Sequence, residues 1–315
     1  TTLRTTRVDA ASPPSGWIVL TRTQDIVMTH PDGSGTHTLL SVARGEFVFD
    51  VALSPDGKQL AYAYYTTPAG RGGGGSDLMV VTIAPDVGKP KLVATRDGPG
   101  VLLGAPSWTP DGQSIAFEAV GLMPTGKASI HCDMVGADGS GRRAVVDGGR
   151  YPTVSPDGKI LAYVKSQNTG DSLWVRPLGG GQEREIVSDV AMAMISYPRF
   201  APDGSLIAFA GVDLSGEIVP TAAPVLMRLN LGDADDVTRS AMRHGLPTNP
   251  YVVAPDGSGL RQVAELFGDD LAMAWSPDGQ WLAVSGAYGL SLLGVADGSE
   301  RDLSQDASFG GIDWR

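Results

Sequence analysis

Apolar-rich runs recur along the chain, and each follows the same short polar turn. The turn has the sequence Pro-Asp-Gly, and a large apolar residue lies two positions before its proline, as Trp275 lies before Pro277. Five copies precede such a run directly, and they are Pro55–Gly57, Pro110–Gly112, Pro156–Gly158, Pro202–Gly204 and Pro277–Gly279; the Pro-Asp-Gly sequences at 31–33 and 255–257 belong to a second type of turn. Proline presets φ at a turn corner, aspartate bonds its own backbone, and glycine accepts a positive φ. Each copy therefore predicts a tight hairpin between two β-strands.

A second turn, Asp-Gly-Ser, comes later in several repeats. Its copies are Asp32–Ser34, Asp138–Ser140, Asp256–Ser258 and Asp297–Ser299, and a short strand is predicted after each. One repeat is thus four strands, A to D, with the Pro-Asp-Gly turn between A and B and the Asp-Gly turn between C and D. Asp111, Asp157 and Asp203 follow one another at intervals of 46 residues, which is typical of the blades of a β-propeller.

The two ends of the chain complete one further repeat. Residues 17–40 predict strands B, C and D without a strand A, whereas residues 308–315 predict a strand A that ends at Trp314. We therefore expect the C-terminal strand to pair with Trp17–Leu20 and close a ring, because closure removes exposed sheet edges. The predicted fold is all-β, a six-bladed β-propeller with four antiparallel strands per blade.

The repeats resemble those of the TolB-type six-bladed β-propeller family, whose WD40-like repeat has the same phrase W-S-P-D-G-K-x-I-A-F. The resemblance covers residues 17–315 and implies this fold. It implies little about activity, because the repeat is a structural device found in proteins of many functions. TolB itself binds a partner through its channel face, so the resemblance implies a protein partner as one expectation.

Residues 1–16 are rich in Thr, Ser and Pro and are interpreted as a tether, and residues 17–315 as one propeller domain. The chain begins at Thr1 without a methionine, so we expect that an upstream signal or anchor was removed. This interpretation predicts a periplasmic or extracellular protein held through its N-terminus.

The two faces of the predicted ring differ in their loops. The A–B and C–D turns are short and uniform, whereas the D–A and B–C loops on the other face are irregular, and binding residues usually lie on such loops. The largest irregular segment is an insertion at 213–250 between strands B and C of one blade. It predicts a short helix capped by Asp233 or Asp235 and stopped at Gly245, which forms either a lid over the channel or a surface decoration.

Composition limits the partners of this protein. The net charge is −11, so the chain lacks the clustered basic residues that a nucleic-acid-binding surface needs. Cys132 is the only cysteine and cannot form an internal disulfide. No stretch approaches the ~20 apolar residues of a membrane span.

Four motifs suggest chemistry but are better explained by structure. Gly170–Leu173 matches the opening of an esterase-like GDSL motif, yet it aligns with ordinary starts of strand C. The glycines of Gly70–Gly75 precede a strand rather than the helix of a dinucleotide site. His131 and Cys132 are adjacent on a strand and point to opposite faces. Asp233–Asp236 is more readily a helix cap than a Ca²⁺ site. We expect neither a metal nor a cofactor.

Candidate binding residues are expected at the start of each strand A, around the channel mouth. The positions three before each large apolar residue are Asp50, Ala105, Tyr151, Tyr197, Ala272 and Gly311. Adding the neighbouring and deeper charged residues gives the predicted binding set, which is Asp50, Arg150, Tyr151, Tyr197, Arg199, Asp269, Asp270 and Asp313. Tyrosines among mixed charges suit recognition of a polar ligand or a protein side chain. Packing between blades and solvation of a water-filled pore explain the same residues equally well.

Three functions remain open from the sequence. The first is a non-catalytic scaffold of the cell envelope that recognises a protein or peptide on the loop-rich channel face. The second is a hydrolase or lyase acting on a small or sugar-like substrate in the channel, with carboxylates converging from separate blades. The third is an accessory or sensor domain of a membrane-anchored protein.

Overall fold

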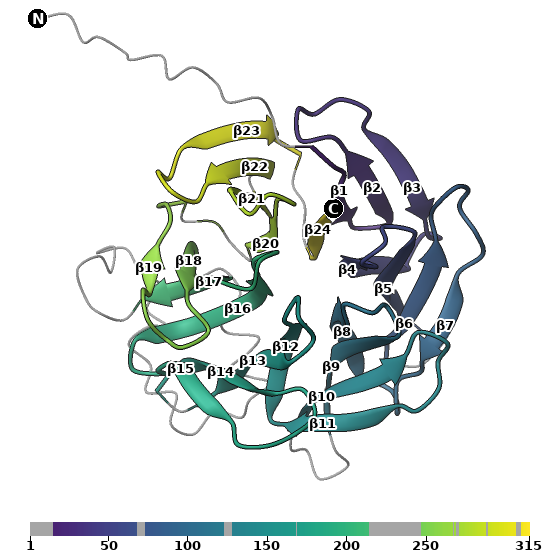
Figure 1. The fold of residues 1–315 in the computed structure, drawn as a ribbon. Coiled ribbons are helices and arrows are strands. Elements are labelled where there is room, and N and C mark those ends of the chain that lie inside the picture. The colour runs from purple at the N-terminus through teal and green to yellow at the C-terminus, as the bar shows by residue number, and fades with distance from the viewer. Residues whose placement is uncertain are drawn as a thin grey trace, which may run out of the picture.

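The fold is given by a computed structural model. It describes residues 15–67, 73–122, 128–167, 169–213, 247–266, 268, 271–287, 289–306 and 310–315. Within these ranges every regular element is a β-strand, and the strands stand around a central axis (Figure 1). The predicted tether and nearly all of the insertion, including its predicted helix, lie outside the described residues.

The strands form five hydrogen-bonded sheets, four of them with four strands each. The first contains β24 (Ile312–Trp314), β1 (Ile18–Arg22), β2 (Asp25–Thr29) and β3 (His37–Ser41). The others are β12 (Gly149–Val154), β13 (Ile160–Ser166), β14 (Asp171–Pro177) and β15 (Arg184–Val187); β16 (Met192–Phe200), β17 (Ile207–Asp213), β18 (Asn249–Val253) and β19 (Arg261–Gln262); and β20 (Ala272–Trp275), β21 (Trp281–Gly286), β22 (Gly289–Gly294) and β23 (Glu300–Ser304).

The fifth sheet has eight strands. It contains β4 (Phe47–Leu53), β5 (Gln59–Thr66), β6 (Gly75–Thr82), β7 (Lys91–Ala94), β8 (Leu102–Trp108), β9 (Ser114–Leu122), β10 (Ala128–Gly136) and β11 (Arg143–Asp147). The sequence predicts two separate sheets here, but a parallel bridge between Ser76 and Leu102 joins β6 to β8. The sheets thus number five rather than six, and no strand pairing among the described strands links them into one continuous hydrogen-bonded ring.

The two ends of the chain meet in the first sheet. Strand β24 pairs antiparallel with β1, with Ile18 opposite Trp314 and Leu20 opposite Ile312. Trp17 and Arg315 extend the ladder, because each donates its backbone N–H to the other's carbonyl, at 2.6 and 3.1 Å. The predicted pairing of the C-terminal strand with the Trp17–Leu20 segment is therefore present.

The Pro-Asp-Gly turns are held by their own side chains. In the first copy, the Ser54 hydroxyl donates to Asp56 Oδ1 at 2.6 Å, and the same oxygen accepts the N–H of Lys58 at 3.1 Å. Gly57 has φ of +67°, a left-handed backbone conformation that residues other than glycine adopt only with strain. These bonds to the ionised form lower the pKa of Asp56, so the turn is fixed by a carboxylate.

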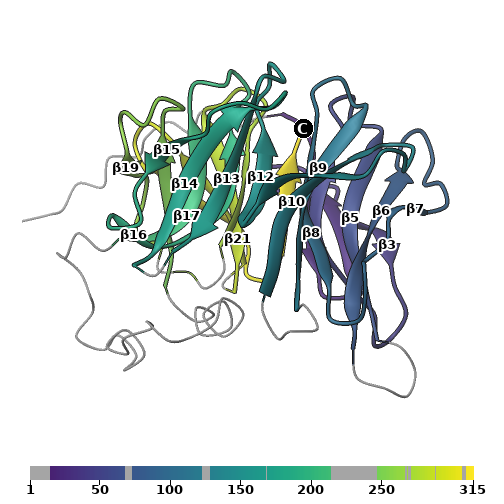
Figure 2. The same cartoon turned by 90° about the horizontal axis from the view of Figure 1, so that it is seen from below.

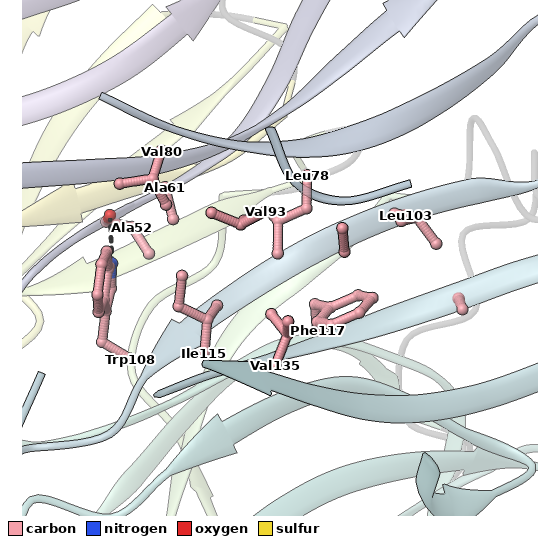
Figure 3. Packing of buried hydrophobic residues seen from close by; sticks show 12 residues of the cluster. Ala52, Ala61, Leu78, Val80, Val93, Leu103, Trp108, Ile115, Phe117 and Val135 are labelled. Carbon is pink, nitrogen blue, oxygen red and sulfur yellow. Dashed lines mark hydrogen bonds between the residues drawn. The ribbon is translucent and has the colours of Figure 1, made fainter. Parts of the chain in front are cut away.

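The hydrophobic core lies between neighbouring sheet segments. Figure 3 shows one cluster in which Ala52, Leu78 and Val80 from β4 and β6 pack on Phe117 from β9 and on Trp108. The Trp108 indole N–H also donates to the Ala52 carbonyl at 3.0 Å. The Trp108 indole therefore ties its segment to the previous one, and the Trp275 indole does the same by donating to the Arg199 carbonyl at 2.9 Å.

Seen from the side, the strands run between two faces of the ring, with the C-terminal end of β24 at one of them (Figure 2). That face carries the Pro-Asp-Gly turns and is called the turn face below. None of the elements in the described ranges is a helix with the length and apolarity that crossing a membrane requires.

Candidate functional site

Four innermost strands share a strained residue at the predicted binding positions. Asp50, Ala105, Tyr151 and Tyr197 have φ between +47° and +50°, although none is glycine. Each lies at a register shift where its strand bulges against the next one. Such conformations cost of order 1–3 kcal/mol and are retained only where the surroundings fix them. The repeat alignment identified these positions, but it contained no signal for their left-handed backbone.

Asp50 is buried at the boundary between β4 and β8. Its Oδ2 accepts the backbone N–H of Ala105 at 2.8 Å. Burial raises the pKa of Asp50 to about 6, because desolvation of the carboxylate outweighs the bond from Ala105. The nearby charge of Glu118 raises this pKa further, whereas Arg199 lowers it.

Glu118 is a second buried carboxylate that the predicted set did not contain. Its Oε2 accepts the backbone N–H of Tyr151 at 3.1 Å and lies 3.6 Å from Nε of Arg150. A Cβ added at Gly104 would lie 2.7 Å from Asp50 Oδ2 and 3.8 Å from Glu118 Oε1, so both carboxylates lie close to this glycine. A charged residue within the apolar run Ile115–Ala119 was the available sequence signal.

Two half-buried tyrosines and a half-buried arginine complete the cluster around these buried carboxylates. The Arg150 guanidinium donates to the Tyr151 hydroxyl at 3.1 Å and lies 4.7 Å from the centre of that ring. The rings of Tyr151 and Tyr197 are 4.8 Å apart at an interplanar angle of 46°. Burial raises the pKa of Tyr151, so its hydroxyl remains protonated at neutral pH. Four predicted residues, Asp50, Arg150, Tyr151 and Tyr197, thus come together with Glu118.

Two further aspartates also hold neighbouring sheets to one another. Asp171 Oδ2 accepts the N–H of Ile195 at 3.0 Å, and Asp313 Oδ2 accepts that of Leu53 at 2.7 Å. Asp171 belongs to the GDSL-like stretch, and its neighbour Ser172 accepts a bond from the Trp174 indole at 2.8 Å. These contacts give the GDSL-like stretch a structural use, and they support the interpretation of the cluster as packing between blades.

A cavity of about 330 Å³ opens at the turn face, where the innermost strands end. Its lining includes the exposed prolines Pro55, Pro110, Pro156, Pro202 and Pro277, the aromatic residues Trp108, Phe200, Trp275 and Trp314, and the charged residues Arg199, Asp313 and Arg315. We call this cavity the central funnel. Apolar walls with a few charged groups are typical of binding sites.

The predicted binding set therefore divides into three parts. Arg199 and Asp313 line the central funnel. Asp50, Arg150, Tyr151 and Tyr197 lie in the cluster with Glu118. Asp269 and Asp270 lie outside the described residues. The funnel opens among uniform turns, whereas the sequence interpretation placed recognition on the irregular loops, because loops vary and turns appeared to serve only the fold.

Little in the described part of the chain suits a metal. No group of three or more His, Cys, Asp or Glu residues there is arranged to hold one. Cys132 is buried, and burial raises the pKa of its thiol. His131 faces Asp133 at 3.4 Å. Asp233–Asp236 and Gly70–Gly72 lie outside the described residues, and a strand, β6, follows the latter.

No protein-family model matches this chain, and no curated protein matches it by sequence. Solved structures do match it. TolB from Acinetobacter baumannii superposes with a TM-score of 0.68 at 16% identity, covering 96% of this chain and 67% of TolB. The fold is a β-propeller. A nidogen/laminin complex matches this propeller with a TM-score of 0.66 at 12% identity, covering 95% of this chain and 97% of the other.

An oligogalacturonate lyase in complex with manganese is a further match to the propeller. Its TM-score is 0.54 at 14% identity, with 89% of this chain and 70% of the lyase covered. Identities this low show a shared fold alone. The function of the propeller must therefore be argued from its own surface.

Proposed function

We propose that this propeller is a non-catalytic binding scaffold that holds a protein or peptide partner at the central funnel. The observation that carries the proposal is the ring of five exposed prolines around buried indoles, with Arg199, Asp313 and Arg315 among them. Grooves lined by aromatic residues accept extended, proline-containing segments, because such segments lose little entropy on binding. The propeller matches TolB and a nidogen/laminin complex, and the latter is itself a protein assembly.

The proposal includes a functional ring of six blades. The halves β4–β7 and β8–β11 of the eight-stranded sheet each repeat the four-strand unit, and a single bridged pair joins them. If these two halves are counted as two blades, the propeller has six blades, and β24 is the strand that closes the ring. Six innermost strands then contribute to one funnel.

A location in the cell envelope is also part of the proposal. It rests on the composition of residues 1–16 and on the TolB-like repeats. Function as an accessory or sensor domain depends on the same segment and stays a prediction.

The hydrolase or lyase alternative has less support. Asp50 and Glu118 both lie near Gly104, and a carboxyl with a pKa of about 6 suits a general acid. However, both carboxylates are buried and accept backbone N–H bonds, and neither lines the central funnel. These bonds give both carboxylates a structural use.

A displayed peptide library panned on the full chain tests the proposed function. Selected peptides are labelled, and their affinity is measured by fluorescence anisotropy. We expect weaker binding to Arg199→Ala and Arg315→Glu, because both side chains line the funnel. Arg143→Glu is the matched control, since Arg143 is exposed on the outer strand β11. Peptides that bind all four proteins equally, or a library that yields no binder, would contradict the proposal.

A further inference from the structure

Two more cavities open on the turn face, and each shares residues with the central funnel. The larger one has a volume of about 1060 Å³ and shares Pro55 and Pro110 with the funnel. The smaller one has a volume of about 300 Å³ and shares Pro202, Trp275 and Pro277. We call them the wide arm and the narrow arm. Because the shared residues line both spaces, each arm adjoins the funnel.

The two arms lie on opposite sides of the ring. The wide arm begins at the turns that follow β4 and β8, and the narrow arm at the turns that follow β16 and β20. In Figure 1, β4 and β8 stand across the centre from β16 and β20, with β12 and β24 between them. The wide arm, the funnel and the narrow arm therefore lie side by side in a row across the turn face, and we call this row of cavities the trough.

The trough changes character along its length. The narrow arm contains the carboxylates Asp203 and Asp278, and neither Lys nor Arg is among its lining residues. The funnel combines prolines and aromatic residues with Arg199, Asp313 and Arg315. The wide arm is polar and of mixed charge, with Lys89 and Lys91 together with three aspartates and several hydroxyl and amide groups. Bonds from Ser205 lower the pKa of Asp203, so this carboxylate stays ionised at neutral pH.

The carboxylates of the narrow arm retain capacity for a ligand. Asp203 Oδ1 accepts the N–H of Ser205 at 2.9 Å, and Asp278 Oδ1 accepts the N–H of Gln280 at 3.0 Å. Within the described residues, the hydrogen bonds of both carboxylates all use Oδ1, so Oδ2 of each is available to a cation. The same bonds hold the turns rigid, which lowers the entropy lost when a ligand binds.

We propose that the trough binds an extended segment of a partner polypeptide, with a Lys or Arg side chain in the narrow arm, apolar or proline residues in the funnel and polar residues in the wide arm. The inference rests on the proposed function and specifies the chemistry and direction of the partner. Charge complementarity sets the direction, because the acidic narrow arm attracts a basic side chain and rejects an acidic one. An extended chain suits a narrow trough that crosses the whole face.

Charge-neutralising variants of the narrow arm test this proposal. Asn keeps the turn bonds that Asp makes through Oδ1, so Asp203→Asn with Asp278→Asn removes charge and keeps the fold. We expect library-selected peptides to carry a basic residue and to bind this double variant about five- to tenfold more weakly. Asp157→Asn is the matched control, because Asp157 lies in the same type of turn but lines none of the three cavities.

Cross-linking tests the direction of the bound segment. An amine-reactive group is placed on the peptide end that is distant from its basic residue, and the linked sites are found by mass spectrometry. We expect links to Lys89 or Lys91 in the wide arm. Links confined to residues outside the turn face would overturn the trough. Replacement of the basic residue by Glu should abolish detectable binding to the wild-type chain and should matter less for the double variant.

The outcomes separate the two proposals. Peptides that respond to Arg315→Glu but bind wild type and the double Asn variant equally would overturn the trough and leave the funnel intact. Two other occupants would also overturn it. One is a second copy of this chain, seen as a dimer in sedimentation that the double variant abolishes. The other is an oligosaccharide that binds the wild-type chain and competes with every selected peptide.

Discussion

The carboxylate of Asp50 accepts the backbone N–H of Ala105 at 2.8 Å, across the boundary between β4 and β8. Both residues have a left-handed backbone, with φ of +49° and +47°. The bond therefore joins two strained bulges and satisfies a buried N–H that would otherwise cost about 1–3 kcal/mol. The Asp50 carboxylate is buried, so the stability of the folded protein should depend on pH.

We expect the free energy of unfolding to contain a contribution from Asp50 that falls as pH rises from about 4 to about 6. The pKa of Asp50 is raised from 3.8 to about 6 in the folded state, so the folded chain binds this proton more tightly than the unfolded chain. The contribution of Asp50 to the free energy of unfolding is therefore largest below pH 3.8. It decreases by about 3 kcal/mol between pH 3.8 and pH 6 and stays constant above that.

Urea unfolding of wild type and Asp50→Asn between pH 4 and pH 8 measures this contribution. The amide keeps an acceptor for Ala105 but does not titrate, so the difference between the two proteins should change through this window. Asp56→Asn is the control. The turn bonds lower the pKa of Asp56, so its own contribution is lost as pH falls rather than as pH rises. Parallel curves for wild type and Asp50→Asn would disprove the prediction.

Gly104→Ala should destabilise the fold by about 1–3 kcal/mol. The added Cβ would lie 2.7 Å from Asp50 Oδ2, so the carboxylate must move away from Ala105. Gly98→Ala is a matched control, since a Cβ there meets nothing within 4 Å. Chemical denaturation of the two variants gives the comparison. Equal stability of both would show that the Asp50 carboxylate can move away from position 104 without loss of stability.

Trp314→Ala should cost about 3–5 kcal/mol, as large core truncations do. Trp314 is 2% exposed and belongs to the three-residue strand β24, which completes the first sheet. Val190→Ala serves as a control because Val190 is 68% exposed, and it should change stability by less than 0.5 kcal/mol. Thermal and urea unfolding test both variants, and a loss below 1 kcal/mol at Trp314 would mean that β24 adds little to the ring.

The local parts of this structure could be predicted from the sequence. Each Pro-Asp-Gly copy contains its own turn chemistry, so the hairpins and the four-strand repeat followed from short stretches. The long-range pairing of β24 with β1 followed from the two incomplete repeats at the ends of the chain, which complement each other. The joining of β6 to β8 could not be predicted, because one bridge between Ser76 and Leu102 depends on how closely two neighbouring repeats approach.

The candidate site was predicted only in part. Alignment of the repeats found the positions of Asp50, Tyr151 and Tyr197 but not their bulges, since tyrosine seldom adopts a positive φ and a single aspartate does not indicate one. Glu118 could have been found as a charge inside an apolar run. The sequence did not predict the funnel, because each of its five turn prolines has two roles. The sequence shows that these prolines form turns, but it does not show that they line a common cavity.

The pairing of β24 with β1 also bears on how the protein is made. Strands β1 to β3 are synthesised before the other described strands, yet their sheet lacks its innermost strand until Trp314 has been synthesised. The later sheets are each built from consecutive strands and can form during translation. We therefore expect the edge of β1 to stay unpaired until the end of folding. We expect this last step to be slow because it joins residues almost 300 positions apart.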